Sequence, residues 1–152
     1  MFAIEQRKRA LDVFFQRAAT LGDDEIKADL AKLGAVLSCG FIERSVEIIV
    51  MEKIQKRAHD RVKSFVKSHF KSGKNYDCIA ICGLLERFDL TWARKMRDWI
   101  QDNPGPVESL TSIYGLRNSI AHGGGQTSSL ARIQAYAEDC KIIVDAMLKA
   151  TR

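Results

Sequence analysis

The sequence of 152 residues has only two prolines, no Cys-x-x-Cys pair and no hydrophobic run long enough to cross a bilayer. Its longest uncharged apolar stretch, residues 33–42, falls well short of the roughly 20 residues that a membrane-spanning helix needs. The amino terminus lacks the order of a signal peptide. The four cysteines stand singly in apolar surroundings, which favours buried thiols in a reducing compartment. We therefore expect a cytoplasmic protein that has no membrane partner.

Helix-forming segments fill the chain. Hydrophobic residues make up 46% of it and charged residues 28%, which excludes collagen-like and disordered classes and supports a packed core. Gly and Asn separate the segments, and neither strand alternation nor internal repeats occur. We expect an all-α, multi-helix bundle that occupies residues 1–152 as a single domain. The expected helices are 2–21, 26–70 (with a division into one or two helices left open), 75–88, 89–101, 104–122 and 128–150, with Asn75, Asp89 and Asn103 as N-caps.

The segment that starts at Ile26 carries two apolar stripes on different sides of one helix, which predicts a helix enclosed by neighbours or by a partner chain. Arg44 falls in the middle of the first stripe, and a charge on an apolar face needs a partner. Two interpretations are open: Arg44 pairs with Glu47, three residues on, or it lines a polar cleft. The first stripe is Leu30, Leu33, Leu37, Phe41, Ile48 and Met51, and the second is Ala35, Cys39, Ile42, Val46 and Ile49.

Positive charge is concentrated between Lys53 and Lys74. This segment holds eight basic residues and one acidic residue, a local charge of +7 in a chain whose formal net charge is +5. A basic arc fits an RNA phosphate backbone, and it also fits a solvated face, a membrane surface or an acidic partner of a structural module. Contacts to the phosphate backbone of RNA give a protein little selectivity for the base sequence. On a continuous helix the arc is formed by Lys53, Lys56, Lys63, Lys67, Lys71 and Lys74, opposite Val62, Phe65 and Val66.

Few residues are available for catalysis. The chain has three histidines and no thiol beside a His, and it contains no Walker loop, no G-x-G-x-x-G and no His-Glu-x-x-His. Cys78 and Cys82 lie one helical turn apart, which indicates core packing and not a metal site. We therefore expect no metal and no other cofactor.

One polar block interrupts an otherwise apolar helix near its end. It runs from Arg117 through Asn118 to His122 and stops at glycines 123–125. Helical geometry puts Asn118 and His122 on one face and Arg117 about 140° round from His122, so Arg and His are expected to flank a groove. The exposed carbonyls of the last turn favour a charged imidazole. The same residues also fit an ordinary helix C-cap with a surface ion pair.

Three segments resemble a known family in the same order along the chain. The stretch from Arg117 to Gly123 is similar to the HEPN motif of Arg, four to six residues and His, with the Asn that commonly follows the Arg. Ser38–Glu47 resembles the long-helix segment of the RiboL-PSP-HEPN branch, and Phe88–Trp92 resembles its mid-chain stretch. The resemblance covers most of residues 30–145.

This resemblance implies a four-helix-bundle-based HEPN fold that forms a homodimer and, in active members, an endoribonuclease that cleaves RNA without a metal. Carried over by position, Arg117 and His122 would be catalytic, and Asn118 would orient the site or bind phosphate. Glu43 and Arg44 also match and are assigned the same supporting role. In the expected reaction, Arg/His pairs from two protomers promote attack of the RNA 2′-hydroxyl on the adjacent phosphate.

The resemblance also implies a biological setting and an alternative. The setting is toxin-like or in host defence, with an antitoxin or a regulatory protein as a possible partner. Many relatives in the wider superfamily have lost activity, and on that alternative the chain is a non-catalytic module that binds RNA, a nucleotide or a protein.

Overall fold

The computed structural model describes residues 1–55, 58–124 and 128–152, apart from the side chain of Ser72. No strand occurs in these ranges, and the predicted all-α class is confirmed. None of their helices is long and apolar enough to cross a membrane. The elements are α1 (Phe2–Ala19), α2 (Asp24–Gln55), α3 (Asp60–His69), the 3-10 turn η1 (Phe70–Ser72), α4 (Cys78–Glu86), α5 (Leu90–Asp102), α6 (Pro104–Ala121) and α7 (Leu130–Ala150).

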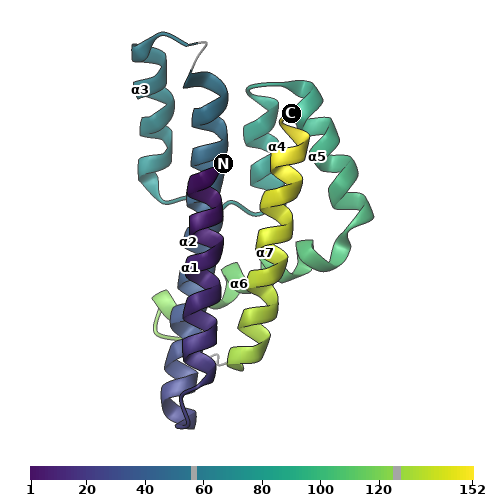
Figure 1. The fold of residues 1–152 in the computed structure, drawn as a ribbon. Coiled ribbons are helices and arrows are strands. Elements are labelled where there is room, and N and C mark those ends of the chain that lie inside the picture. The colour runs from purple at the N-terminus through teal and green to yellow at the C-terminus, as the bar shows by residue number, and fades with distance from the viewer. Residues whose placement is uncertain (56–57, 125–127) are drawn as a thin grey trace.

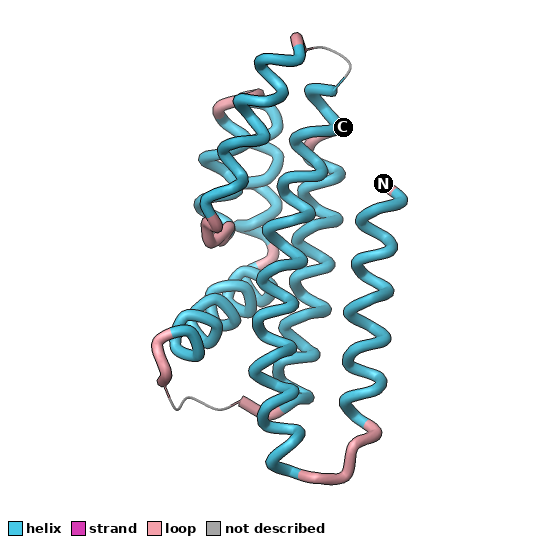
Figure 2. Tube along the Cα trace, turned by 90° about the vertical axis from the view of Figure 1, so that its left-hand side faces the viewer, coloured by secondary structure: helices cyan, strands magenta, loops and turns pink. Residues whose placement is uncertain are grey.

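Helices α1, α2 and α7 run side by side along the molecule (Figure 1). Helix α3 packs on the C-terminal half of α2, while α4 and α5 pack together and α5 contacts α7. Helix α6 contacts both α2 and α7. Figure 2 shows α6 lying across the long helices, with its C-terminal end projecting from the bundle.

Helix α2 lies at the centre of the core because it is buried on two sides. All members of its predicted second stripe are buried, among them Cys39 and Ile49. Phe41 of the first stripe is buried as well, but Leu33 and Leu37 remain exposed. Neighbouring helices therefore enclose the second stripe and cover only part of the first.

The segment expected at 26–70 forms two helices. Helix α2 ends at Gln55, and α3 begins after His59, whose Nδ1 accepts a hydrogen bond from the Arg61 N–H at 3.3 Å. Helix α3 buries none of its residues fully, and Phe65 is 77% exposed. The apolar residues predicted opposite the basic arc are therefore partly exposed to solvent, because α3 has few neighbours to pack against.

The helix starts agree with the sequence at Asp89 and Asn103 but not at Asn75. Asp89 caps α5 with its carboxylate, and Asn103 occupies the N-cap position of α6 without a side-chain cap bond. The prediction of Asn75 as a cap was wrong, because Asp77 caps α4 by accepting the Ala80 N–H at 2.8 Å. Asn75 is engaged elsewhere, in contact with α6.

All four cysteines are free and buried, as the sequence predicted. Burial raises the pKa of the Cys39 and Cys78 thiols to about 12. Burial also raises the pKa values of Cys82 and Cys140. Burial thus disfavours the thiolate form that a cysteine nucleophile needs.

Substitutions of two helical glycines are expected to change the free energy of unfolding in opposite directions. A Cβ on Gly34 in α2 would lie 3.0 Å from the Phe15 ring, so Gly34→Val should lower the free energy of unfolding by about 1–3 kcal/mol through overpacking. A Cβ on exposed Gly83 in α4 would meet no atom within 4 Å, so Gly83→Ala should raise that free energy by about 0.5–1 kcal/mol. Urea denaturation at one fixed protein concentration measures both. Equal effects of the two substitutions would contradict this packing of α1 on α2.

Candidate active site

The end of α6 is fixed by its own backbone. His122 is the C-cap, and its N–H donates to the Asn118 carbonyl at 3.1 Å. Gly123 follows with a φ of 72°, and the Gly124 N–H donates to the Ser119 carbonyl at 2.8 Å, which together form a Schellman turn. A Cβ on Gly124 would meet the Ser119 hydroxyl and would lie 3.0 Å from the Ser119 carbonyl oxygen, so a side chain at this position would force Ser119 to shift. The cap therefore sets where the His122 backbone lies.

Arg117 and Asn118 form a polar cluster with Asn75 from the segment before α4. The Arg117 Nη1 donates to Asn118 Oδ1 at 3.3 Å and to Asn75 Oδ1 at 3.4 Å, and Asn75 Nδ2 donates to Asn118 Oδ1 at 3.4 Å. These distances are long for N–H···O bonds, so each bond is weak. A guanidinium has five N–H donors, and Nη1 is the only nitrogen of Arg117 that donates to a described residue. Most of its donors remain available to a ligand.

Asn75 is a site residue that the sequence analysis missed. Two tyrosines bring it to α6: the Tyr76 N–H donates to the Tyr114 hydroxyl at 3.0 Å, and both side chains are buried. The Cys39 thiol of α2 approaches the Ile113 carbonyl at 3.8 Å on the same stretch of α6. No local pattern in the sequence shows a contact between residues so far apart, and an N-cap was the simpler interpretation of Asn75.

Glu43 of α2 belongs to the electrostatic environment of Arg117. Burial raises the pKa of the Glu43 carboxyl, and the positive charge of Arg117 opposes that rise. The same guanidinium charge acts on the Cys39 thiol one turn earlier in α2. Glu43 and Asn118 therefore both lie near Arg117.

The His122 side chain differs from its neighbours in being free. Its residue is exposed, and its imidazole makes no hydrogen bond or ion pair to any residue that the structure describes. Arg117 lies five positions earlier in the helix, about 140° round the axis, so the two side chains leave α6 in different directions. Within one chain, His122 thus lies at the C-terminal end of α6, the end that projects from the bundle in Figure 2, and is not part of the hydrogen-bonded Arg117 cluster.

Arg44 satisfies both interpretations left open by the sequence. Its guanidinium pairs with the Glu47 carboxylate, and the Arg44 side chain remains 58% exposed while that of Glu47 is 14% exposed. The pair lines a surface groove of about 440 Å³ between α1, α2 and α3. Arg7, Lys63 and Lys67 line the same groove. We call the surface formed by Arg7, Arg44, Lys63 and Lys67 the basic groove.

The remaining lysines of the predicted arc are dispersed. Lys53 lies in α2, and its ammonium lies 5.9 Å from the centroid of the Trp92 ring of α5. Lys71 is exposed in η1, and Lys56 lies outside the described residues. The end of α2 at Gln55 separates Lys53 from the lysines of α3, so the described members of the arc do not share one helix face.

Lys74 lines a small cavity of about 190 Å³ together with Asn75, which is a member of the Arg117 cluster. His69 and Arg87 belong to the same lining. Burial lowers the pKa of His69, and the charges of Lys74 and Arg87 lower it further. The positive charge of this cavity therefore comes from Lys74 and Arg87.

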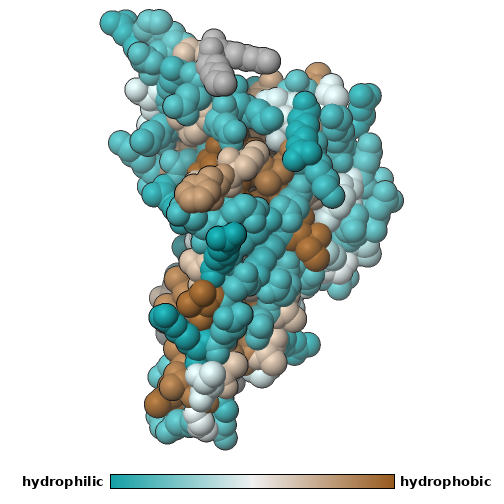
Figure 3. Space-filling model, viewed as in Figure 1, coloured by the Kyte–Doolittle hydropathy of each residue, from teal (hydrophilic) through white to brown (hydrophobic). Residues whose placement is uncertain are grey.

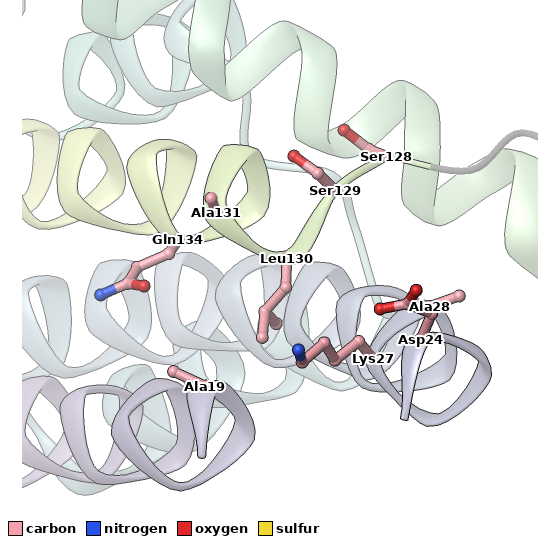
Figure 4. A pocket seen from close by; sticks show the side chains of 9 residues that line it. All are labelled: Ala19, Asp24, Lys27, Ala28, Ser128, Ser129, Leu130, Ala131 and Gln134. Carbon is pink, nitrogen blue, oxygen red and sulfur yellow. The ribbon is translucent and has the colours of Figure 1, made fainter. Parts of the chain in front are cut away.

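A wider cavity of about 530 Å³ lies where α1 ends and where α2 and α7 begin (Figure 4). Asp24 and Lys27 of α2, Ser129 and Gln134 of α7 and Ala19 of α1 are among the side chains that line it. It contains none of the predicted site residues. Its mixed lining has no arrangement of groups for acid–base chemistry, so it is not the candidate site.

The cluster around Arg117 suits a phosphate ester. A guanidinium with free donors binds phosphate oxygens, and an exposed imidazole can act as a general acid or base. In the described ranges no three His, Cys, Asp or Glu residues gather closely enough to hold a metal ion. The groups that are present support proton transfer and charge stabilisation at phosphorus.

A sequence model of the RiboL-PSP-HEPN family matches residues 3–151, almost the whole chain. No curated protein and no solved structure matches the sequence.

The electrostatic link between Arg117 and Glu43 can be measured directly. In Arg117→Ala the pKa of Glu43 should rise further, because the positive charge that opposes the effect of burial is gone. Carbon-13 NMR titration of the glutamate carboxyl groups reports this pKa. Arg44→Ala is the matched control, since Arg44 pairs with Glu47 and should leave the pKa of Glu43 in place. Equal shifts in the two variants would contradict the arrangement.

Proposed function

The chain belongs to the RiboL-PSP-HEPN family, and from this premise we propose that it is a homodimeric, metal-independent endoribonuclease. Family membership by itself supports a ribonuclease or another RNA-related module. The finer assignment is carried by one observation. Arg117, whose guanidinium has uncommitted donors, lies five residues before the exposed His122 at the end of the same helix.

The proposed reaction is attack of an RNA 2′-hydroxyl on the adjacent phosphorus. The new 2′-oxygen–phosphorus bond forms as the bond from phosphorus to the 5′-oxygen breaks, leaving a 2′,3′-cyclic phosphate and a 5′-hydroxyl. One imidazole takes the proton of the 2′-hydroxyl, and a second gives a proton to the leaving oxygen. Arg117 stabilises the charge that develops on the phosphate oxygens. Asn118 holds the guanidinium and binds a phosphate oxygen, while Glu43 supports Arg117 through its charge.

The reaction needs two histidines, and this motif supplies one per chain. A twofold dimer that brings two α6 ends together supplies a pair of imidazoles and a pair of guanidinium groups around one phosphate. Helix α2 offers an apolar face for such a contact, because Leu33, Val36 and Leu37 remain exposed. The surface in Figure 3 is mostly hydrophilic, with brown patches in its upper middle part, on its right side and toward the lower end, where α1 and α2 meet. We assign the dimer contact to this part of α2.

The alternative is a non-catalytic module that binds RNA, a nucleotide or a protein within the single domain of residues 1–152. One observation favours it: no carboxylate or carbonyl among the described residues orients the His122 imidazole. The setting that we propose for the enzyme is cytoplasmic, as a toxin or defence protein controlled by an antitoxin or regulatory partner. That setting comes from the family and not from the geometry.

Cleavage without a metal is the first test. Purified protein incubated with folded RNA in EDTA should produce 2′,3′-cyclic ends. Arg117→Ala and His122→Ala should each lower the rate by about 10²–10⁴-fold, the range expected for loss of one acid–base or charge-stabilising group. Gel analysis with end-group chemistry measures both quantities.

Two controls make this test specific. His59→Asn removes another imidazole while keeping a capping side chain on α3, and its rate should equal that of the wild type. A substrate with 2′-deoxyriboses throughout should not be cleaved. If the protein binds RNA but does not cleave it at any protein concentration, the proposed enzyme is wrong and the non-catalytic binding module is supported.

The shared site makes a quantitative prediction for mixed dimers. If only dimers with two intact histidines cleave, an exchanged equal mixture of wild type and His122→Ala should retain about one quarter of the activity of undiluted wild type. Independent sites would retain about half. Mixing with Arg94→Ala, an exposed arginine outside the cluster, is the control and should leave the activity unchanged. The rate is measured at fixed total protein after subunit exchange.

A further inference from the structure

The basic groove gathers positive charge from three helices that are separate in the sequence. Arg7 comes from α1, Arg44 from α2, and Lys63 and Lys67 from α3. The wall between them includes Ile48 and Met51 of α2, which are both partly buried. Cations beside an apolar wall repel one another in a medium of reduced dielectric, so an anion that enters the groove relieves this repulsion.

The charges in the groove are only partly neutralised. Glu47 pairs with Arg44, and Asp60 at the start of α3 pairs with Lys63 at 2.9 Å. Arg7 and Lys67 form no ion pair with any described residue. Two uncompensated cations therefore face a groove whose other two cations already hold their partners. An elongated polyanion fits this distribution better than a single small anion, because the free charges lie on opposite walls, α1 and α3.

The groove begins beside the candidate active site. Glu43 and Arg44 are consecutive residues of α2, and the first lies in the electrostatic field of Arg117 while the second lines the groove. From Arg44 the groove extends along α2 to Gln55, a rise of about 16 Å at 1.5 Å per residue. That length accommodates the backbone of up to about five stacked nucleotides at 3.4 Å each.

We propose that the basic groove binds the phosphodiester backbone of the RNA strand that flanks the cleaved linkage, with Arg7 and Lys67 as its principal phosphate contacts. The proposal rests on the proposed function for its choice of RNA. It adds Arg7 of α1 to the binding surface, and it restricts the predicted arc to the two lysines of α3 that line the groove. Glu47 weakens binding there, since its carboxylate lies among the cations.

The test uses an RNA that this chemistry cannot cleave. A fluorescein-labelled, single-stranded RNA of 12 nucleotides with 2′-O-methyl riboses is titrated with protein, and anisotropy gives the dissociation constant at several salt concentrations. In Arg7→Gln/Lys67→Gln the slope of log affinity against log salt should fall in magnitude by about 1.4, the value for two lost contacts to a single strand. The control Arg132→Gln/Lys149→Gln removes two exposed α7 cations without ion pairs among the described residues, and it should leave the slope unchanged.

A second variant is expected to raise the affinity for RNA, so its effect does not depend on the loss of a contact. Glu47→Gln should tighten binding of the RNA, because it removes a mostly buried carboxylate from the groove and frees the Arg44 guanidinium from its ion pair. Glu108→Gln, an exposed carboxylate at the start of α6, is its control and should have no effect. Equal slopes in the two double variants, weaker binding by Glu47→Gln, or no binding by the wild type at low salt would each overturn the proposal.

Failure of the enzyme and failure of the groove are distinguishable. A wild type that binds the methylated RNA through Arg7 and Lys67 but leaves unmodified RNA intact overturns the proposed function and keeps the groove. A wild type that cleaves RNA but loses no salt dependence in Arg7→Gln/Lys67→Gln keeps the enzyme and overturns the groove. Circular dichroism of each variant establishes that the helices are retained.

Discussion

The crossing of α6 over α2 determines where the residues of the Arg117 cluster lie. Ile113 and Tyr114 are buried at this crossing against α2, so the next turn of α6 emerges above Glu43 with Arg117 and Asn118 half-exposed. The Tyr114 hydroxyl also holds the backbone of Tyr76, which delivers Asn75 to the cluster. Apolar burial thus positions the helix, and a single hydrogen bond from a buried tyrosine adds the third polar side chain.

The sequence contained enough information for the helices and for the motif at the end of α6. Periodic apolar residues predict a long central helix, and the second stripe of α2 is buried as that pattern indicates. Gly123 after a polar turn predicts the helix end, because a positive φ there suits glycine alone. Asp89 predicts an N-cap because its side chain accepts N–H groups that the helix leaves free. These features depend on residues close together in the chain.

The contacts between distant segments were not accessible in this way. Asn75 looks like a cap when only its neighbours are considered, and its actual partners lie more than forty residues later. Arg7 stands among the polar residues of an amphipathic helix, and only the packing of α1 and α3 on α2 places it in the basic groove. A helical wheel assumes one continuous helix, so it grouped Lys53 with lysines from which the end of α2 separates it. Each case required the three-dimensional arrangement.

The glycine turn after α6 fixes the backbone position of His122 by local hydrogen bonds. Its hydrogen bonds return to carbonyls of α6 itself, so His122 owes its place to the helix and not to the loop beyond Gly124. The backbone at residue 122 is therefore set by hydrogen bonds that lie within residues 118–124. The place of this residue is therefore inherited with α6 and with the glycine at position 123, whose φ of 72° few other residues adopt.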